Sequence, residues 1–189
     1  MRMRYFGDSY DIVKQSLLRW LRDFGEWSVH PMFTEPVLPD DAAAFASLLG
    51  AEVVSTEVLT QVTDRAAYLA CASSCANLFL DPDTGLWMRP TRGSRAPEYL
   101  FAYELLRLCE QRPDFLTIVF DQSVGRGTER LHLERKLHEL GRHGTSGFAY
   151  VSHACFVVAA RNRALVERAR RQILAESRLP ESRFLPVIA

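Results

Sequence analysis

Three aspartates directly follow two strongly apolar segments of the chain. Asp81 and Asp83 come after the run ANLFL, and Asp121 comes after FLTIVF. A short apolar run that ends in an acid is typical of a buried parallel strand. Open parallel sheets bind ligands beyond the carboxyl ends of their strands. These acids are therefore expected to lie close together if the two strands are neighbours.

Carboxylate oxygens are the ligands that Mg²⁺ prefers, usually together with the phosphates of a substrate. Two such ions can stabilise both oxygens of an in-line phosphoryl displacement. The pattern predicts that Asp81, Asp83 and Asp121 hold Mg²⁺ or Mn²⁺ and act as catalytic residues. The predicted enzyme is a phosphoester hydrolase of the nuclease or phosphoesterase type, with nucleic acid among its candidate substrates.

Basic loops follow both acidic segments. Arg92 follows the first acid pair, and Arg126 and Arg130 follow Asp121. Guanidinium groups match the geometry of phosphate oxygens, so these arginines are candidate substrate-binding residues. His153, in the segment YVSHACF, is a candidate general acid or base.

Each of these residues also has a structural explanation. The segment Asp-Pro-Asp-Thr-Gly is an ordinary turn, and aspartates at strand ends often cap the next helix. A histidine between apolar residues is more often a core histidine than a ligand. Arginine is also the preferred cation of this chain, in which Lys14 and Lys136 are the only lysines.

Composition indicates a globular chain. Of its 189 residues 48% are hydrophobic, and 23 Lys and Arg balance 23 Asp and Glu. With this balance, no overall electrostatic field attracts the protein to nucleic acid or to a membrane. No apolar run reaches the roughly 20 residues of a membrane span, and the four cysteines form no CxxC pair. We expect a cytoplasmic protein with reduced thiols and no membrane partner.

Hydrophobic periodicity predicts alternating helices and strands. Helices are expected over 11–25, 39–50, 64–76, 98–111, 128–144 and 162–177, and strands over 27–33, 51–59, 76–81, 115–121 and 147–161. The last segment is either one long strand or a strand pair. Residues 82–99 are expected to form a loop. In the helix over 128–144, we expect Leu131, Leu133, Leu137 and Leu140 to face inward.

This order predicts one α/β domain over residues 1–189. The expected architecture is a three-layer Rossmann-like fold, with a mainly parallel sheet and helices on both faces.

The segment LFLDPDTG, with VSHACFVVAARN further on, resembles the second half of a Rossmann-like methyltransferase over about residues 76–160. In that family the fourth strand ends in a (D/N)PP(Y/F) motif, which orients the target nitrogen in amino-methyltransferases. The resemblance implies this role for Asp81 and Pro82. It departs at Asp83, which stands in place of the second proline, and no glycine-rich loop for S-adenosylmethionine precedes it.

The sequence thus leaves three hypotheses open. The first is the metal-dependent hydrolase. The second is a methyltransferase-like enzyme with an atypical or lost site for S-adenosylmethionine. The third is a non-catalytic binding module on a degenerate enzyme fold, for which the aspartates are only turn and cap residues.

Overall fold

The computed structural model describes residues 2–188. The main helices are α1 (Ser9–Trp20), α2 (Pro39–Leu49), α3 (Arg65–Tyr68), α4 (Ala102–Gln111), α5 (Glu129–Arg142) and α6 (Arg163–Ser177). The strands are β1 (Trp27–His30), β2 (Glu52–Val53), β3 (Asn77–Leu80), β4 (Gly85–Trp87), β5 (Tyr99–Phe101), β6 (Thr117–Phe120), β7 (Ser146–Tyr150) and β8 (Phe156–Ala160). None of the described helices is long and apolar enough to cross a bilayer.

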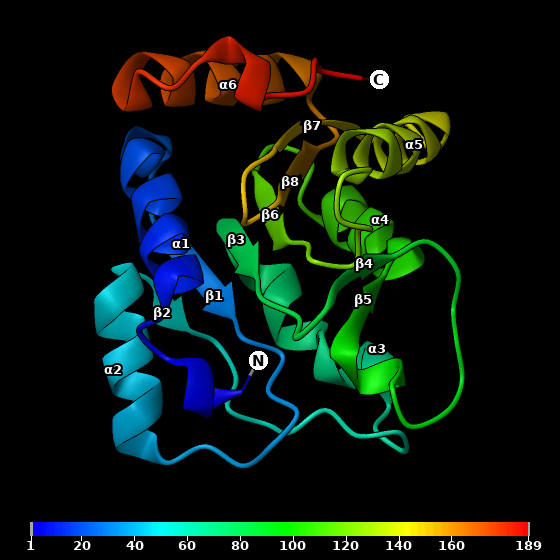
Figure 1. The fold of residues 1–189 in the computed structure, drawn as a ribbon. Coiled ribbons are helices and arrows are strands. Elements are labelled where there is room, and N and C mark those ends of the chain that lie inside the picture. Colours follow the sequence, from blue (N-terminus) through cyan, green and yellow to red (C-terminus); the bar gives the residue numbers. More distant parts are fainter. Residues whose placement is uncertain (1, 189) are drawn as a thin grey trace.

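A six-stranded sheet with the order β2-β1-β3-β6-β8-β7 forms the centre of the molecule (Figure 1). The strands β2, β1, β3 and β6 pair in parallel, whereas β8 is antiparallel to both β6 and β7. The predicted α/β class with a mainly parallel sheet is therefore confirmed. The segment over 147–161 forms a strand pair, and its second strand lies between the first and β6.

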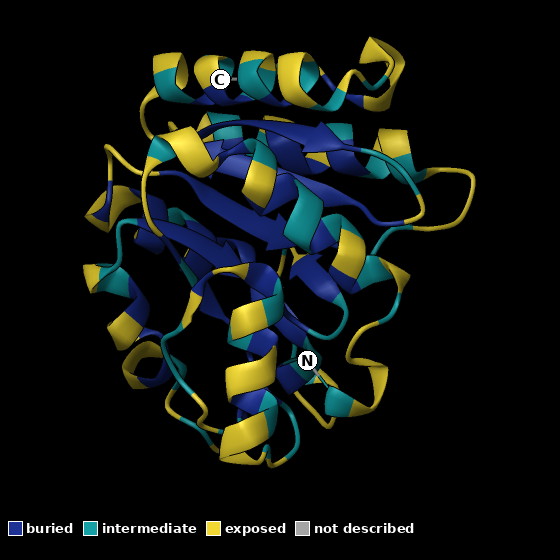
Figure 2. Ribbon diagram, turned by 90° about the vertical axis from the view of Figure 1, so that its left-hand side faces the viewer, coloured by how far each residue is buried: buried dark blue, intermediate teal, exposed yellow. Residues whose placement is uncertain are grey.

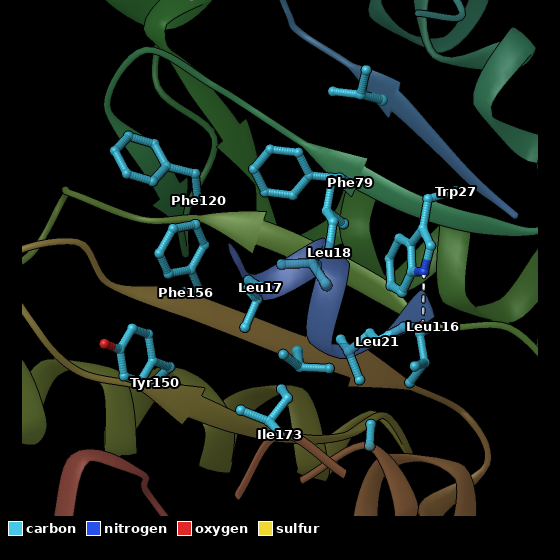
Figure 3. Packing of buried hydrophobic residues seen from close by; sticks show 14 of the residues in the cluster. Leu17, Leu18, Leu21, Trp27, Phe79, Leu116, Phe120, Tyr150, Phe156 and Ile173 are labelled. Atoms are coloured by element: carbon cyan, nitrogen blue, oxygen red, sulfur yellow. Dashed lines mark hydrogen bonds between the residues drawn. The ribbon is translucent and has the colours of Figure 1, made fainter. Parts of the chain in front are cut away.

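Helices lie on both sides of this sheet (Figure 1). One apolar cluster joins α1, α2 and α6 to the sheet, and Figure 3 shows its centre, where Leu17 and Leu18 of α1 lie near Phe79 and Phe156 of the strands. A second cluster joins α3, α4 and α5 to the opposite face. The strands are buried, and the outer helix faces are exposed (Figure 2).

The helix boundaries follow from local chemistry. Asp8 accepts hydrogen bonds from two backbone N–H groups of α1, and Asn162 accepts one from the N–H of Leu165 in α6. Such caps satisfy N–H groups that have no partner within the helix. Gly50 ends α2 with φ of +63°, a conformation that costs glycine little. The N-cap of α2 is Leu38, whose side chain makes no capping hydrogen bond, and Pro39 is the first residue of the helix.

Several predictions of local structure were wrong. The expected loop over 82–99 contains β4, and β5 replaces the start of the helix expected over 98–111; these strands form a separate two-stranded parallel sheet. Their segments lack the length and alternation by which strands are recognised in a sequence. The helix expected over 64–76 is only α3, followed by a 3-10 helix over Ala70–Ser74. Leu131 is 47% exposed, whereas Leu133, Leu137 and Leu140 are buried as expected.

His30 shapes the turn that follows β1. Its ring is fully buried; Nδ1 accepts a hydrogen bond from the N–H of Met32, and Nε2 lies 3.3 Å from the carbonyl oxygen of Tyr68. This arrangement requires the neutral ring with its proton on Nε2. Burial lowers the pKa of His30 to about 4. The bond to Met32 supports a residue with φ of +51°, which L side chains rarely adopt.

We predict that His30 makes the protein less stable in mild acid. The unfolded chain takes up a proton near the ordinary pKa of 6.5, whereas the folded chain resists it down to about 4. The contribution of His30 is therefore complete above pH 6.5 and falls by up to about 1.4 kcal/mol per pH unit between 6.5 and 4. Urea unfolding across this range should show a shallower pH dependence for His30→Asn than for the wild type. Parallel curves would contradict the prediction.

Candidate functional site

The register of β3 and β6 separates the two strand-end acids. Leu80 lies opposite Val119, so Asp81 continues the row of Phe120, and Asp121 falls one position later. Successive side chains of a strand point to opposite faces. Asp81 therefore points toward α1, as Phe79 does, and Asp121 points toward α5, as Val119 does. The strands are neighbours, as expected, but their acids do not meet.

Asp81 belongs to a buried triad with Lys14 and Asp11. The ammonium group of Lys14 lies 2.8 Å from Oδ2 of Asp81 and 2.8 Å from Oδ1 of Asp11. All three side chains are at most 6% exposed. The second oxygen of Asp11 accepts a hydrogen bond from the N–H of Gly7. Oδ1 of Asp81 has no hydrogen-bond partner among residues 2–188.

In the triad two carboxyl groups share one ammonium group. Burial raises the pKa of Asp81 more than the attraction of Lys14 and of the amino-terminal charge lowers it. Although burial lowers the pKa of Lys14, its attraction to Asp81 and Asp11 raises that pKa above the ordinary value. Lys14 is therefore charged, and Asp81 takes up a proton more readily than an exposed aspartate.

Asp83 connects the turn after β3 to two other segments. Its Oδ2 accepts hydrogen bonds from the hydroxyl of Thr34, which follows β1, and from Nε of Arg2. Although burial raises the pKa of Asp83, these contacts with Thr34 and Arg2 help to lower it below its ordinary value. Arg2 also reaches Glu98. The loops beyond β1 and β3 are thus tied together by the amino-terminal segment.

Asp121 belongs to a second, electrically neutral pair on the other face. Its carboxylate lies 2.6 Å from the ammonium group of Lys136 and 2.6 Å from the hydroxyl of Ser123, and it accepts the N–H of Leu86. Lys136 also donates to Ser123 and to the carbonyl oxygen of Leu86. This network joins β6, α5 and β4, and all three ammonium protons of Lys136 are used.

A cavity of about 290 Å³ lies over the triad, between α1 and the ends of β3 and β6. Its lining combines charged groups with aromatic rings: Arg2, Tyr5, Asp8, Tyr10, Asp11, Lys14, Asp81, Pro82, Asp83, Phe120 and Gln122. Among the described lining residues, four carboxyl groups face two cations, which gives them a formal charge of −2. His153 lies at its rim, because its ring is 5.3 Å from that of Tyr10 and its carbonyl oxygen accepts from Gln122.

The structure gathers only some of the candidate residues. Asp81, Asp83 and His153 lie in or beside this cavity, whereas Arg92, Arg126 and Arg130 do not line it. Arg92 and Arg126 are exposed, and Arg130 donates to the carbonyl oxygen of Ser182. Within residues 2–188, no group of three or more His, Cys, Asp or Glu side chains could hold a metal ion.

Sequence reasoning missed both lysines. Lys14 precedes Leu17 and Leu18 in the buried stripe of α1, which Leu21 continues just beyond the helix. Lys136 lies in the buried stripe of α5, between Leu133 and Leu137. The spacing i, i+3, i+4, i+7 marks one helix face. A lysine within such an apolar stripe was the available signal, since an isolated buried charge is costly without a partner.

We predict that the triad tolerates loss of one acid better than loss of its cation. Asp81→Asn leaves a neutral pair of Lys14 and Asp11, so the free energy of unfolding should fall by only about 1 kcal/mol. Lys14→Met leaves two buried carboxylates without a cation and should cost about 3–5 kcal/mol. Denaturant unfolding at neutral pH measures both. Equal losses would show that the charge balance of the triad does not control stability.

We also predict that Gly85 cannot carry a side chain. A Cβ atom there would lie 2.3 Å from Oδ1 of Asp121 and 2.8 Å from its Cα, and φ is +134°. Gly93 is the matched control, because its φ is +108° but no atom lies within 4 Å of its Cβ position. Gly93→Ala should cost about 1–2 kcal/mol from backbone strain alone, whereas Gly85→Ala should cost at least about 2 kcal/mol more. A similar loss at both positions would contradict the close packing at Asp121.

No known protein family, curated protein or solved structure matches this chain. A function for this chain is therefore inferred from the geometry of the site.

Proposed function

We propose that this chain binds a small planar molecule with an amino group in the cavity over the Asp11–Lys14–Asp81 triad. The observation that carries the proposal is the carboxyl group of Asp81, which lines the cavity and whose Oδ1 accepts no hydrogen bond from residues 2–188. A carboxyl oxygen that faces a cavity can accept a hydrogen bond from a ligand N–H group. The excess of carboxyl groups over cations among the described lining residues favours the same class.

The walls of the cavity suit a flat ring. Tyr10 and Phe120 are in edge-to-face contact at 5.7 Å, and Tyr5 is 56% exposed at the mouth. Aromatic walls with a few polar groups are typical of small-molecule sites, whose volumes are usually about 300–1,000 Å³. At about 290 Å³, this cavity suits one small ligand rather than a substrate together with a large cofactor.

The position of the cavity supports a Rossmann-like three-layer fold for the chain. The order β2-β1-β3-β6 places the change of direction between β1 and β3, and such sheets bind ligands near that point. The terminal strand pair agrees with the resemblance to methyltransferases, in which the segment equivalent to Asp81 and Pro82 orients a target nitrogen.

The four cysteines are free thiols, which suits a protein of the reducing cytoplasm.

The residues present do not fit the cofactors of the other two hypotheses. Beyond β1, where a loop for S-adenosylmethionine would be expected, Met32 and Phe33 are fully buried, and Thr34 bonds to Asp83. At Asp81 and Asp121, lysine ammonium groups occupy positions 2.8 and 2.6 Å from the carboxylate oxygens. A divalent ion would have to displace them. The metal-dependent hydrolase therefore has less support than ligand binding.

We predict that adenosine, a planar heteroaromatic amine, binds more tightly than inosine. Inosine has a similar shape, but a carbonyl oxygen replaces the amino group and would face the carboxylate. A site built to bond an N–H group should disfavour inosine by at least about tenfold. Isothermal titration calorimetry measures both affinities. Asp81→Asn should reduce the preference, whereas Asp114→Asn, an exposed acid outside the cavity, should not.

Equal affinities for the two nucleosides, or an unchanged preference in Asp81→Asn, would overturn the proposal. Titrations with Mn²⁺ and with S-adenosylmethionine test the alternatives in the same instrument. Saturable binding of Mn²⁺ that is lost in Asp81→Asn would favour the metal-dependent enzyme, and saturable binding of S-adenosylmethionine would favour the methyltransferase-like enzyme.

A further inference from the structure

A second hollow of about 440 Å³ lies on the opposite face of the sheet, between β4 and α5. The end of β6 contributes to both sites, because Phe120 and Gln122 line the first cavity and Ser123 lines the second. Alternation along the chain thus sends neighbouring residues to separate sites. The second hollow takes no part in the function proposed above.

The floor of this hollow is fixed and neutral. Lys136 lies there, 5% exposed, and its three protons go to Asp121, Ser123 and the carbonyl oxygen of Leu86. Asp121 balances the charge of Lys136. Because these three acceptors use all its protons, Lys136 has none left to donate to a ligand. The floor therefore defines only the shape of the hollow, and any polar contacts with a ligand must come from residues at the rim.

The rim is positively charged. Arg89 and Arg135 line the hollow, are exposed and form no ion pair with any residue from 2 to 188. The one carboxylate in the lining, Glu139, lies 2.6 Å from Arg142 and 3.7 Å from His143. Two unpaired guanidinium groups at one hollow suit phosphate oxygens, which they can bind bidentately.

The same hollow presents an aromatic surface. Trp87 is 40% exposed at the end of β4, and its ring contacts that of Tyr99 at a centroid distance of 5.1 Å. An indole ring that is fixed by a neighbour and open to solvent can stack on a planar base, a contact worth about 1–3 kcal/mol for nucleic-acid bases. The hollow thus offers stacking and phosphate binding side by side.

From this arrangement we infer that the hollow between β4 and α5 binds a free nucleotide. Its base stacks on Trp87, and its phosphate binds Arg89 and Arg135. This site is distinct from the amine-binding cavity, and either can exist without the other.

The test uses inosine 5′-monophosphate, because its base lacks the amino group that the first cavity is proposed to bind. Calorimetry should show saturable binding, with inosine at least about tenfold weaker because it lacks the phosphate. Arg89→Ala and Arg135→Ala should each weaken binding of the nucleotide by about tenfold. Arg171→Ala, an exposed arginine of α6 outside the hollow, should leave the affinity unchanged.

A second measurement locates the base. Binding of the nucleotide should quench tryptophan fluorescence in the wild type, and Trp87→Phe should remove most of the quenching. Arg89 and Arg135 are exposed and form no hydrogen bond or ion pair with residues 2–188, so thermal unfolding of their variants should match the wild type. Equal affinities for nucleotide and nucleoside, unchanged affinity in both folded arginine variants, or quenching that persists in Trp87→Phe would overturn the inference. Binding of a single-stranded oligonucleotide alone would also do so.

Discussion

The carboxyl-terminal edge of the sheet depends on two buried lysine ammonium groups. Lys14 of α1 reaches the end of β3, and Lys136 of α5 reaches the end of β6 from the other face. Removing a charge from water costs several kcal/mol unless a partner and hydrogen bonds compensate. Each lysine therefore requires its aspartate at one position, and this requirement fixes where each helix crosses the sheet. The chain has no other lysines.

The two networks differ in their balance of charged groups. Lys136 and Asp121 balance each other, and the remaining groups of that network are satisfied by Ser123 and by backbone of β4. Lys14 faces two carboxyl groups, and that of Asp81 lines a cavity with aromatic walls. A neutral, fully bonded network stabilises the fold, whereas the carboxyl group of Asp81 is the one that the proposed ligand would contact.

Segments far apart in the chain close the region beyond β1. Arg2 reaches Asp83 after β3 and Glu98 before β5, and Thr34 after β1 reaches the same aspartate. Met32, whose left-handed conformation is supported by a hydrogen bond to His30, is fully buried in the same segment as Thr34. These contacts fill the place where a parallel sheet usually admits a large ligand. The open cavity is therefore displaced toward α1 and β6, next to the triad.

The sequence by itself determined the α/β class, the buried strands that end in Asp81 and Asp121, and most of the helices. Continuous apolar runs and helical periodicity are local signals, so one chain is enough to read them. Only the tertiary structure decided which acids share a site. The strands are neighbours, but a register offset of one residue turns Asp81 and Asp121 to opposite faces. Register arises from packing between segments distant in the chain, and no local pattern encodes it.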